Sequence, residues 1–370
     1  MNIITVTNFI FGCAVALFVA QSAQGSDVPQ FPAGNINPPA TSAQPSGVSV
    51  RAFPPIGPLP PVTVPADNPQ TEAKIELGKK LYFDPRLSGN NWISCATCHN
   101  PTLGFTDGLP RMLGGPTSQE GGRNSPTIIN CAYNEFQFWD GRAATLEEQA
   151  LGPIQNPNEM VETLDNVVRK LSGIPGYVKA FKEVFGTGVT ADGIAKAIAA
   201  FERTIVFANS PFDRYMQGDV NAMSESARRG MELFIGKAEC IECHNGPNFT
   251  DNKFHNIGVP ADGPLKEDLG RYNVTKNEAD KGAFKTPTLR NITETGPYMH
   301  NGYFPTLFEV VQFYNGGGCE SKGSPDIHAL NLTGQEVNDL IEFMKALTGE
   351  LVQITYNATP LVYPNLPKGF

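Results

Sequence analysis

The stretches Cys95-Ala96-Thr97-Cys98-His99 and Cys240-Ile241-Glu242-Cys243-His244 decide the interpretation of this chain. In each, two residues separate a pair of cysteines and a histidine follows the second cysteine, which is the pattern of covalent c-type haem attachment. Each thiol forms a thioether with a vinyl group of one porphyrin, and the histidine supplies the proximal nitrogen to the iron. Two such stretches in 370 residues therefore predict two covalently bound haem c groups.

Other uses of paired cysteines fit these stretches poorly. A structural zinc site gathers four ligands from paired motifs, usually without a histidine directly after the second cysteine. A thioredoxin-like dithiol lies at the end of a strand in a βαβ unit, and no such pattern surrounds either stretch. The residues predicted to attach haem or bind its iron are Cys95, Cys98, His99, Cys240, Cys243 and His244.

The amino-terminal 25 residues resemble a secretory signal. The apolar run over residues 9–20 is too short to span a bilayer, and Ala23-Gln24-Gly25 offers small residues for cleavage. No Lys or Arg precedes the apolar run, which departs from the usual signal pattern. We expect a periplasmic protein without a membrane span after cleavage, because c-type haem is attached outside the cytoplasm in bacteria.

The formal net charge is −9 at pH 7, and the haem propionates would add further negative charge. Nucleic acid is therefore not expected as a partner. Residues 26–70 are rich in proline and favour extended conformations, so they are predicted to form a disordered leader.

An internal repeat follows the leader. The two Cys-X-X-Cys-His motifs, residues 95–99 and 240–244, are called the first and second haem words below. A segment at residues 77–83 precedes the first haem word, and Asn100 and Phe105-Thr106-Asp107 follow it. A similar segment at residues 229–234, the second haem word, Asn245 and Phe249-Thr250-Asp251 repeat this order. We therefore predict an amino-terminal haem domain over residues 71–218, a carboxy-terminal haem domain over 219–352, and a tail over 353–370.

The apolar residues between and after the two repeated segments recur at helical spacing. One face is formed by Val161, Leu164, Val168 and Leu171. Residues 194–205 show a second face after Thr190, and Thr333 with Glu336 forms a capping-box pattern before a third face that extends to residue 347. No alternating strand pattern of useful length occurs, so the predicted fold class is mainly α.

Two cysteines, Cys131 and Cys319, are left after the haem words and Cys13 of the signal are set aside. They could form a disulfide in an oxidising compartment or remain two separate buried thiols. Sequence spacing does not decide between these alternatives.

Longer motifs connect the two haem words to a known family. They include Phe138-Trp139-Asp140-Gly141-Arg142-Ala143 and Lys285-Thr286-Pro287-Thr288-Leu289-Arg290-Asn291, together with residues 77–81, 83–88, 152–154, 156–157, 159–160, 254–258 and 297–302. With these motifs the chain resembles the bacterial dihaem cytochrome c peroxidase and MauG family over about residues 70–350. The resemblance implies two cytochrome-c-like haem domains in tandem.

The resemblance also implies roles for particular residues. The amino-terminal haem would react with hydrogen peroxide, and the carboxy-terminal haem would take up or store electrons. Glu159 matches the family's acid/base carboxylate, Gln149 its distal amide and Trp139 the tryptophan between the haems. A calcium ion would be bound between the domains by Asn124, Thr295 and Pro297.

Two departures from most dihaem peroxidases bear on the haem ligands. The loop at residues 112–117, which usually carries a histidine that caps the first iron, has none, so that iron is expected to be five-coordinate when oxidised. Tyr314 occupies the usual methionine position at the second haem, as in MauG. A phenolate favours ferric and higher-valent iron, whereas a thioether favours ferrous iron. In the alternative, Tyr314 only packs and Met299 or His255 binds the second iron.

Three functions remain open at this point. The first is a peroxidase that reduces hydrogen peroxide with electrons from a small redox protein such as a cytochrome c or cupredoxin. The second is a MauG-like enzyme that oxidises residues of a partner protein through a high-valent dihaem state. Ala238 replaces the MauG tryptophan through which the partner is oxidised, and Tyr303 is a candidate substitute. The third is an electron carrier with two six-coordinate haems.

Overall fold

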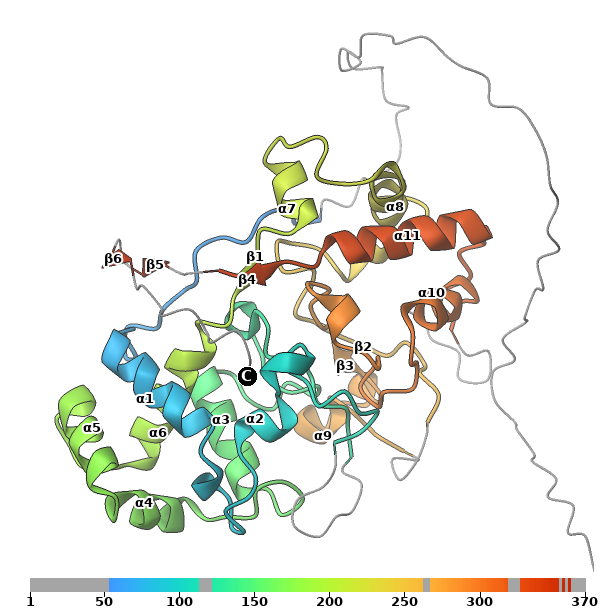
Figure 1. Cartoon of the computed structure of the whole chain (residues 1–370). Coiled ribbons are helices and arrows are strands. Elements are labelled where there is room, and N and C mark those ends of the chain that lie inside the picture. Colours follow the sequence, from blue (N-terminus) through green and yellow to red (C-terminus); the bar gives the residue numbers. More distant parts are fainter. Residues whose placement is uncertain are drawn as a thin grey trace, which may run out of the picture. The chain divides into compact units, whose positions relative to one another are not determined.

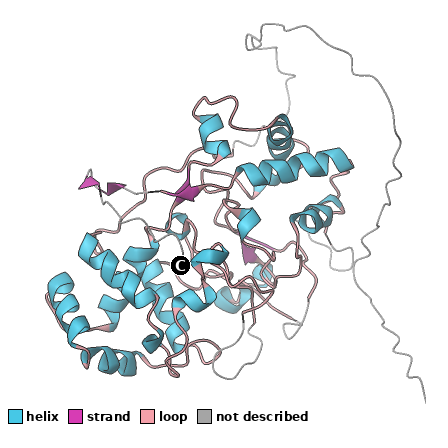
Figure 2. Ribbon diagram, in the orientation of Figure 1, coloured by secondary structure: helices cyan, strands magenta, loops and turns pink. Residues whose placement is uncertain are grey.

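The structure is a computed structural model that describes residues 53–112, 122–261, 267–318 and 327–352, with the backbone of 355–356 and 359–360. Helices predominate in these ranges (Figure 2), which confirms the mainly α prediction. The α-helices, labelled in Figure 1, are α1 (Glu72–Tyr82), α2 (Cys95–Cys98), α3 (Leu146–Gln155), α4 (Leu164–Ser172), α5 (Pro175–Phe185), α6 (Ala191–Glu202), α7 (Pro211–Met216), α8 (Glu225–Ile235), α9 (Tyr272–Thr275), α10 (Leu307–Asn315) and α11 (Gly334–Ala346).

The strands in the described ranges are two residues long and form antiparallel pairs. β1 (Phe207–Ala208) pairs with β4 (Glu350–Leu351), and β2 (Phe254–His255) pairs with β3 (Phe284–Lys285). β5 (Thr355–Tyr356) pairs with β6 (Thr359–Pro360). The first two pairs join segments that are distant in sequence, the third joins neighbouring residues, and none forms a sheet that could serve as a core.

Two helix pairs carry the internal repeat. α1 packs against α6 where Gly78 faces the backbone of Ala197, and α8 packs against α11 where Gly230 faces the backbone of Asp339. A Cβ atom added to Gly78 would lie 1.8 Å from the Ala197 carbonyl oxygen, and one added to Gly230 would lie 1.9 Å from that of Asp339. Both crossings therefore require a residue without a side chain.

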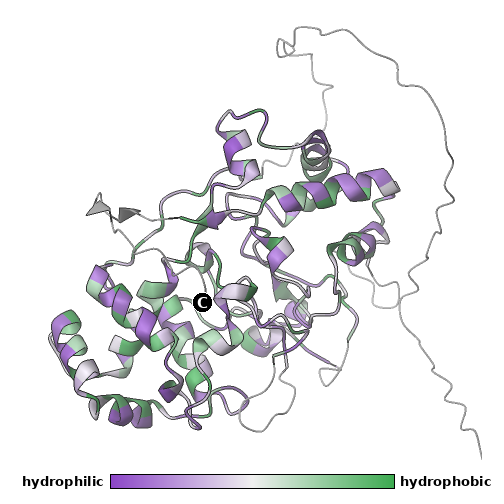
Figure 3. Ribbon diagram, viewed as in Figure 1, coloured by the Kyte–Doolittle hydropathy of each residue, from purple (hydrophilic) through white to green (hydrophobic). Residues whose placement is uncertain are grey.

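Aromatic rings fill the same place in each helix pair. In the first, the ring centroids of Tyr82 and Phe201 are 5.1 Å apart, and in the second those of Phe234 and Phe343 are 5.2 Å apart. Phe201 lies four positions after Ala197, and Phe343 lies four positions after Asp339. Each of these two rings is therefore on the helix face that meets the glycine. α11 carries apolar and polar residues on different faces, as Figure 3 shows. The observed repetition supports the expectation of two related domains.

The helix starts follow the predicted capping chemistry. Thr190 accepts a hydrogen bond from the backbone at the start of α6, and Thr333 with Glu336 forms the capping box of α11. The helix predicted from Val161 begins later, because Thr163 caps α4 and Val161 has φ of 52°. A β-branched residue in the left-handed region cannot continue a helix.

Part of the predicted leader packs against the helices. The Tyr133 hydroxyl donates to the Pro60 carbonyl at 2.7 Å, and the Arg290 Nη2 group donates to the Gly57 carbonyl at 2.8 Å. Apolar side chains of this segment contact the core around α1 and α6; they are Leu59, Val62 and Val64. The description of residues 26–70 as a disordered leader is therefore wrong for residues 54–70, whose apolar and carbonyl groups find partners. The predicted signal lies outside the described residues.

α7 connects the predicted domains. Its Phe212 ring packs against Phe249 at 5.2 Å and Phe343 at 5.9 Å, both in the predicted second domain. A domain boundary after residue 218 remains a prediction, and α7 shares the second aromatic cluster although the boundary assigns it to the first domain. None of the helices in the described ranges has both the length and the apolar character needed to cross a bilayer.

Candidate functional site

The first haem word forms a short helix with a fixed start. α2 begins at Cys95, and the Thr97 hydroxyl accepts a hydrogen bond from the Ser94 backbone N–H at 3.0 Å. The chain turns after Cys98, and the His99 backbone N–H donates to the Cys95 carbonyl at 2.9 Å. This turn places both thiols and the imidazole on one local scaffold, as attachment of a single porphyrin requires.

The same bond orients the histidine in both haem words. The Nδ1 atom of His99 lies 3.4 Å from the Phe105 carbonyl oxygen, and that of His244 lies 3.0 Å from the Phe249 carbonyl oxygen. A carbonyl can only accept, so Nδ1 carries the proton and Nε2 is the nitrogen that can bind iron. The donor set of each word therefore fits a c-type haem, and each acceptor belongs to the repeated Phe-Thr-Asp motif.

Glu159 lies within electrostatic range of the first haem word. Its carboxylate contributes to the raised pKa values of the Cys95 and Cys98 thiols, after the larger effect of burial on each. Burial raises the pKa of Glu159 itself, whereas Arg142 and a 2.6 Å hydrogen bond from the Asn156 side chain oppose that rise. A carboxyl group with a raised pKa in a partly dehydrated place is suited to proton transfer near neutral pH.

Gln149 and Arg142 lie on the chain around α3. Gln149 is half-buried within α3, and Glu159 follows the end of the same helix. Arg142 precedes α3, and its guanidinium carbon lies 3.5 Å from the centroid of the Phe138 ring. The charge of Arg142 lowers the pKa of Glu159, so the two side chains lie near one another. The sequence analysis assigned Glu159 a role but did not assign one to Arg142.

Tyr314 lies beside the second haem word. It is near the end of α10, which begins with a capping box of Thr306 and Glu309. Burial raises its pKa, and the thiols of Cys243 and Cys240 raise it further. The phenol is therefore placed among the residues that would surround the second haem.

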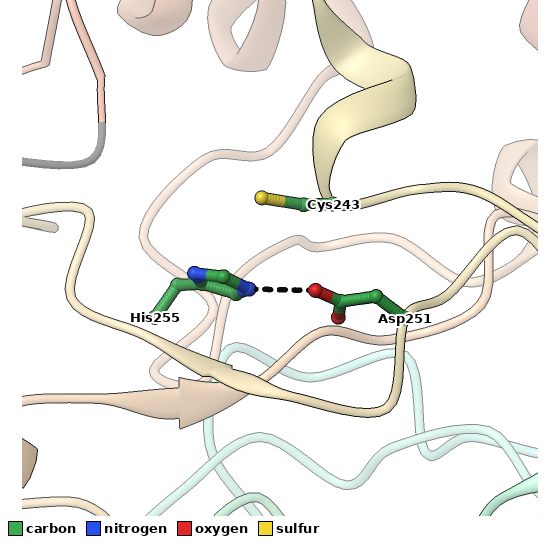
Figure 4. A group of neighbouring side chains, drawn as sticks. All are labelled: Cys243, Asp251 and His255. Atoms are coloured by element: carbon green, nitrogen blue, oxygen red, sulfur yellow. Dashed lines mark hydrogen bonds and ion pairs between the residues drawn. The ribbon is translucent and has the colours of Figure 1, made fainter. Parts of the chain in front are cut away.

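The alternative ligand His255 has another partner. Its Nε2 atom lies 2.9 Å from Oδ2 of Asp251 (Figure 4). Hydrogen bonds with Asp251 and with Cys243 raise the pKa of His255 to about 10. Potential ligand atoms of the three residues lie within 4.8 Å of one another. Because Cys243 belongs to the haem word, we interpret the group as part of the second haem site and not as a separate metal centre.

Trp139 lies between segments of the two predicted domains. Its indole Nε1 donates to the Asn124 carbonyl at 2.9 Å, and its own carbonyl accepts from the Lys285 backbone N–H at 2.8 Å. Both the indole and its backbone are therefore fixed, which suits a group that must hold one position between two cofactors.

The predicted calcium residues lie at this junction. The Asn124 backbone N–H donates to the His300 carbonyl at 2.8 Å, and its side-chain Nδ2 donates to the Leu109 carbonyl at 2.9 Å. A cation would consequently be bound through Oδ1 of Asn124. A Cβ atom added to Gly104 would meet the Glu294 backbone and the Thr295 side chain, so the segment after the first haem word approaches Thr295. These oxygen donors suit a hard cation such as calcium.

An ionic group beside Trp139 was not anticipated. Arg123 donates to Asp140 at 2.8 Å and to Asp268 at 2.6 Å, and its guanidinium carbon lies 5.4 Å from the Phe284 ring centroid. The Phe284 ring stacks on His300 at 3.6 Å. Only the adjacency of Arg123 to Asn124 could have indicated this group, since its partners are distant in sequence.

Two predictions concern residues outside the described ranges. Most of the loop without a histidine lies at residues 113–121, and Cys319 lies in 319–326. Cys131 is buried, with its Sγ atom 3.9 Å from the Glu202 carbonyl oxygen. The open coordination position and the disulfide therefore stay predictions.

Comparison with known proteins gives a consistent result. The family model described as di-haem cytochrome c peroxidase matches residues 72–221. The chain is 43% identical over 334 residues to cytochrome-c peroxidase IdrP1 of Pseudomonas sp. (strain SCT), covering 82% of this chain and 88% of that protein. It is 41% identical over 300 residues to methylamine utilization protein MauG of Methylorubrum extorquens, covering 80% and 84% respectively.

A solved structure shows the same fold. The crystal structure of a MauG-like protein associated with microbial copper homeostasis matches with a TM-score of 0.71 and 33% identity. The match covers 79% of this chain and 94% of that one. The tandem arrangement of cytochrome-c-like domains is thus supported by sequence and by structure.

Proposed function

This chain belongs to the di-haem cytochrome c peroxidase and MauG family and is a haem peroxidase with two haem cofactors, and on that premise we propose that it reduces hydrogen peroxide at the amino-terminal haem. The haems would be attached covalently through the two cysteine pairs, with His99 and His244 as proximal ligands. The observation that carries the proposal is Glu159, a half-buried carboxyl group of raised pKa, held by Asn156, whose charge acts on both thiols of the first haem word.

A haem held by Cys95, Cys98 and His99 would supply the electrons for cleavage of the O–O bond. Glu159 in its ionised form accepts the proton of the peroxide oxygen nearer the iron. The same carboxyl group then donates this proton to the departing oxygen, which leaves as water. The Asn156 side chain, 2.6 Å from Oε1 of Glu159, holds the carboxyl group in one orientation during both transfers.

Gln149 and Arg142 assist the two proton transfers in different ways. The Gln149 amide donates a hydrogen bond to the departing oxygen, which is the role of a preorganised polar donor. Arg142 favours the ionised form of Glu159 and so keeps part of the population ready to accept a proton.

Trp139 would lie on the route of electrons from a haem held by Cys240, Cys243 and His244 to the first site. The indole is held by Asn124 and the backbone by Lys285, which links the two halves of the route. Calcium bound by Asn124, Thr295 and Pro297 would keep this junction in place. The donor is a small redox protein such as a cytochrome c or cupredoxin, and the reaction takes place in the periplasm.

A MauG-like reaction is the second candidate because of Tyr314. A phenolate ligand would favour oxidised states of the second iron, and Tyr314 lies beside Cys240 and Cys243. The position of the MauG tryptophan is taken by the buried Ala238, so a partner protein would be oxidised through another residue. Tyr303 is one candidate, and Trp92, which is 84% exposed three residues before Cys95, is another.

Peroxide addition to the purified diferric protein distinguishes these functions. The reaction is followed by absorption spectroscopy with and without a reduced small cytochrome. Rapid, repeated oxidation of the cytochrome supports the peroxidase. A long-lived oxidised state with slow cytochrome turnover supports the MauG-like enzyme, and the absence of any reaction with peroxide contradicts both.

A further inference from the structure

Glu202, at the end of α6, is a buried carboxyl group without a role in the proposed reaction. It is 4% exposed, and its Oε2 atom has no hydrogen-bond partner in the described part of the chain. Buried carboxylates are normally paired or hydrogen-bonded, so an orphaned oxygen at this depth requires an explanation.

Glu202 lies in the core of the first haem domain, on the side of Cys95. The charge of Glu202 raises the pKa of Cys95 more than any other charged group does. It also raises the pKa of Tyr82, whose hydroxyl donates to the His99 carbonyl at 2.7 Å. The fold gives the same location, because the ring of Phe201, the residue before Glu202, lies 5.1 Å from the ring of Tyr82. Glu202 is therefore close to α1 and α2, which carry Tyr82 and the first haem word.

The groups that face Glu202 give it little compensation. Arg203 favours its ionised form, but the Arg203 guanidinium is already bonded to Glu147 at 2.8 Å and 2.9 Å. Glu147 disfavours ionisation of Glu202. The titratable and charged groups around it, from every element packed there, are Tyr82 of α1, Cys95 of α2, Cys131, Glu147 of α3 and Arg203.

Burial, the largest of these effects, raises the pKa of Glu202 to about 8. The carboxyl group is therefore neutral in a substantial part of the population near neutral pH. Its charge would respond to a change in the charge of a neighbouring cofactor, because electrostatic interactions are strong where water is excluded.

We propose that Glu202 is a proton-binding site that is coupled to oxidation and reduction of the first haem. When the haem loses one electron to an external acceptor, the positive charge favours loss of the Glu202 proton to solvent. When the haem regains an electron from the small redox donor, Glu202 binds a proton again. Glu202 acts through the electrostatic field and does not touch peroxide, so the proposal rests only on haem attachment at Cys95 and Cys98.

Potentiometric titration of the holoprotein tests this coupling. The midpoint potential of the first haem is measured by absorption at a series of pH values on both sides of pH 8. An ionised carboxylate stabilises the oxidised haem, so the midpoint potential should fall as the pH rises. The slope should approach, without exceeding, about 59 mV per pH unit for a one-electron couple.

Glu202→Gln keeps the shape of the side chain but removes the proton. The expected result is loss of most of the pH dependence, with the potential held near its low-pH value. Glu148→Gln on the neighbouring α3 is the matched control, because it removes an exposed charge of the same sign and should keep the wild-type slope. An unchanged slope in Glu202→Gln, as expected if only the haem propionates titrate, overturns the proposal.

A second measurement needs no variant. Redox-difference infrared spectra of the wild-type holoprotein, with glutamate labelled by carbon-13, should show a protonated carboxyl band that weakens on oxidation of the first haem. Absence of a label-sensitive band near pH 8 contradicts the proposal even where the Gln variant does not fold. Neither readout uses peroxide, so failure here leaves the proposed peroxidase reaction intact, and failure of the peroxide reaction leaves this coupling testable.

Discussion

Gly78 and Gly230 occupy equivalent helix crossings, each with a backbone carbonyl oxygen of the opposing helix less than 2 Å from the place of a Cβ atom. The distances are 1.8 Å to Ala197 and 1.9 Å to Asp339. Each crossing lies in the helix pair that supports one haem word. The close approach therefore fixes how the two haem domains are built, and it accounts for a glycine at the same point of each repeat.

Gly78→Ala and Gly230→Ala should each destabilise the protein. A methyl group at either site must push apart two backbones, so we expect a loss of at least about 1–3 kcal/mol in the free energy of unfolding. Chemical denaturation of the holoprotein, followed by circular dichroism, measures this change. Gly176→Ala on α5 is the control, because a Cβ atom there meets open space and stability should be kept or slightly increased. Wild-type stability in both crossing variants would contradict the role of the glycines.

The sequence predicted the repeated parts of the molecule well. The haem words, the mainly α class and the caps at Thr190 and Thr333 are local patterns, and their chemistry acts over a few residues. The position of Val161 outside α4 was missed because helical spacing alone does not reveal a left-handed residue.

Contacts between distant segments could not be predicted in the same way. The ion pairs of Arg123 with Asp140 and Asp268 join residues whose proximity only the fold creates. The burial of Glu202 was not predicted either, since glutamate side chains are mostly exposed to solvent. Its burial follows from the packing of α6 against α1 and α3.

Glu159→Gln should slow peroxide cleavage by about 10²–10⁴-fold, because the amide cannot accept and return a proton. Stopped-flow mixing of the diferric variant with peroxide measures the rate of the first spectral change. Glu148→Gln, an exposed change of the same charge, is the control and should react at the wild-type rate. An unchanged rate in Glu159→Gln removes this residue from the proposed reaction.

The rate of peroxide cleavage should depend on pH through Glu159. Burial raises its pKa, so the ionised, proton-accepting form is lost as the pH falls through this raised value. The rate should consequently decrease toward acidic pH, with a midpoint above that of an ordinary glutamate. The same pH profile in Glu159→Gln as in the wild type would assign the titration to another group.

Arg290→Met should be strongly destabilising. Arg290 and Asp213 form a 2.9 Å ion pair whose side chains are only 1% and 2% exposed. Removal of the guanidinium leaves a buried carboxylate unpaired, with an expected loss of about 3–5 kcal/mol. Lys345→Met breaks an exposed pair with Glu342 and should cost about 1 kcal/mol or less. Equal thermal or denaturant midpoints for the two variants would contradict this difference.

Tyr314→His should raise the reduction potential of the second haem while both haems remain attached. Imidazole lacks the negative charge of a phenolate and stabilises ferric iron less. Spectroelectrochemical titration measures the potential, and Tyr303→Phe is a control that should leave it unchanged. An unchanged potential and ferric spectrum in Tyr314→His would favour Met299 or His255 as the ligand.

The electron paramagnetic resonance spectrum of the isolated diferric holoprotein tests the central claim most directly. The claim is that the first iron has an open face at which Glu159 can assist peroxide cleavage. The expected spectrum contains one high-spin ferric haem, at the first site, and one low-spin ferric haem, at the second. Two low-spin haems at rest would show that a side chain occupies the open position, and would contradict the proposed reaction.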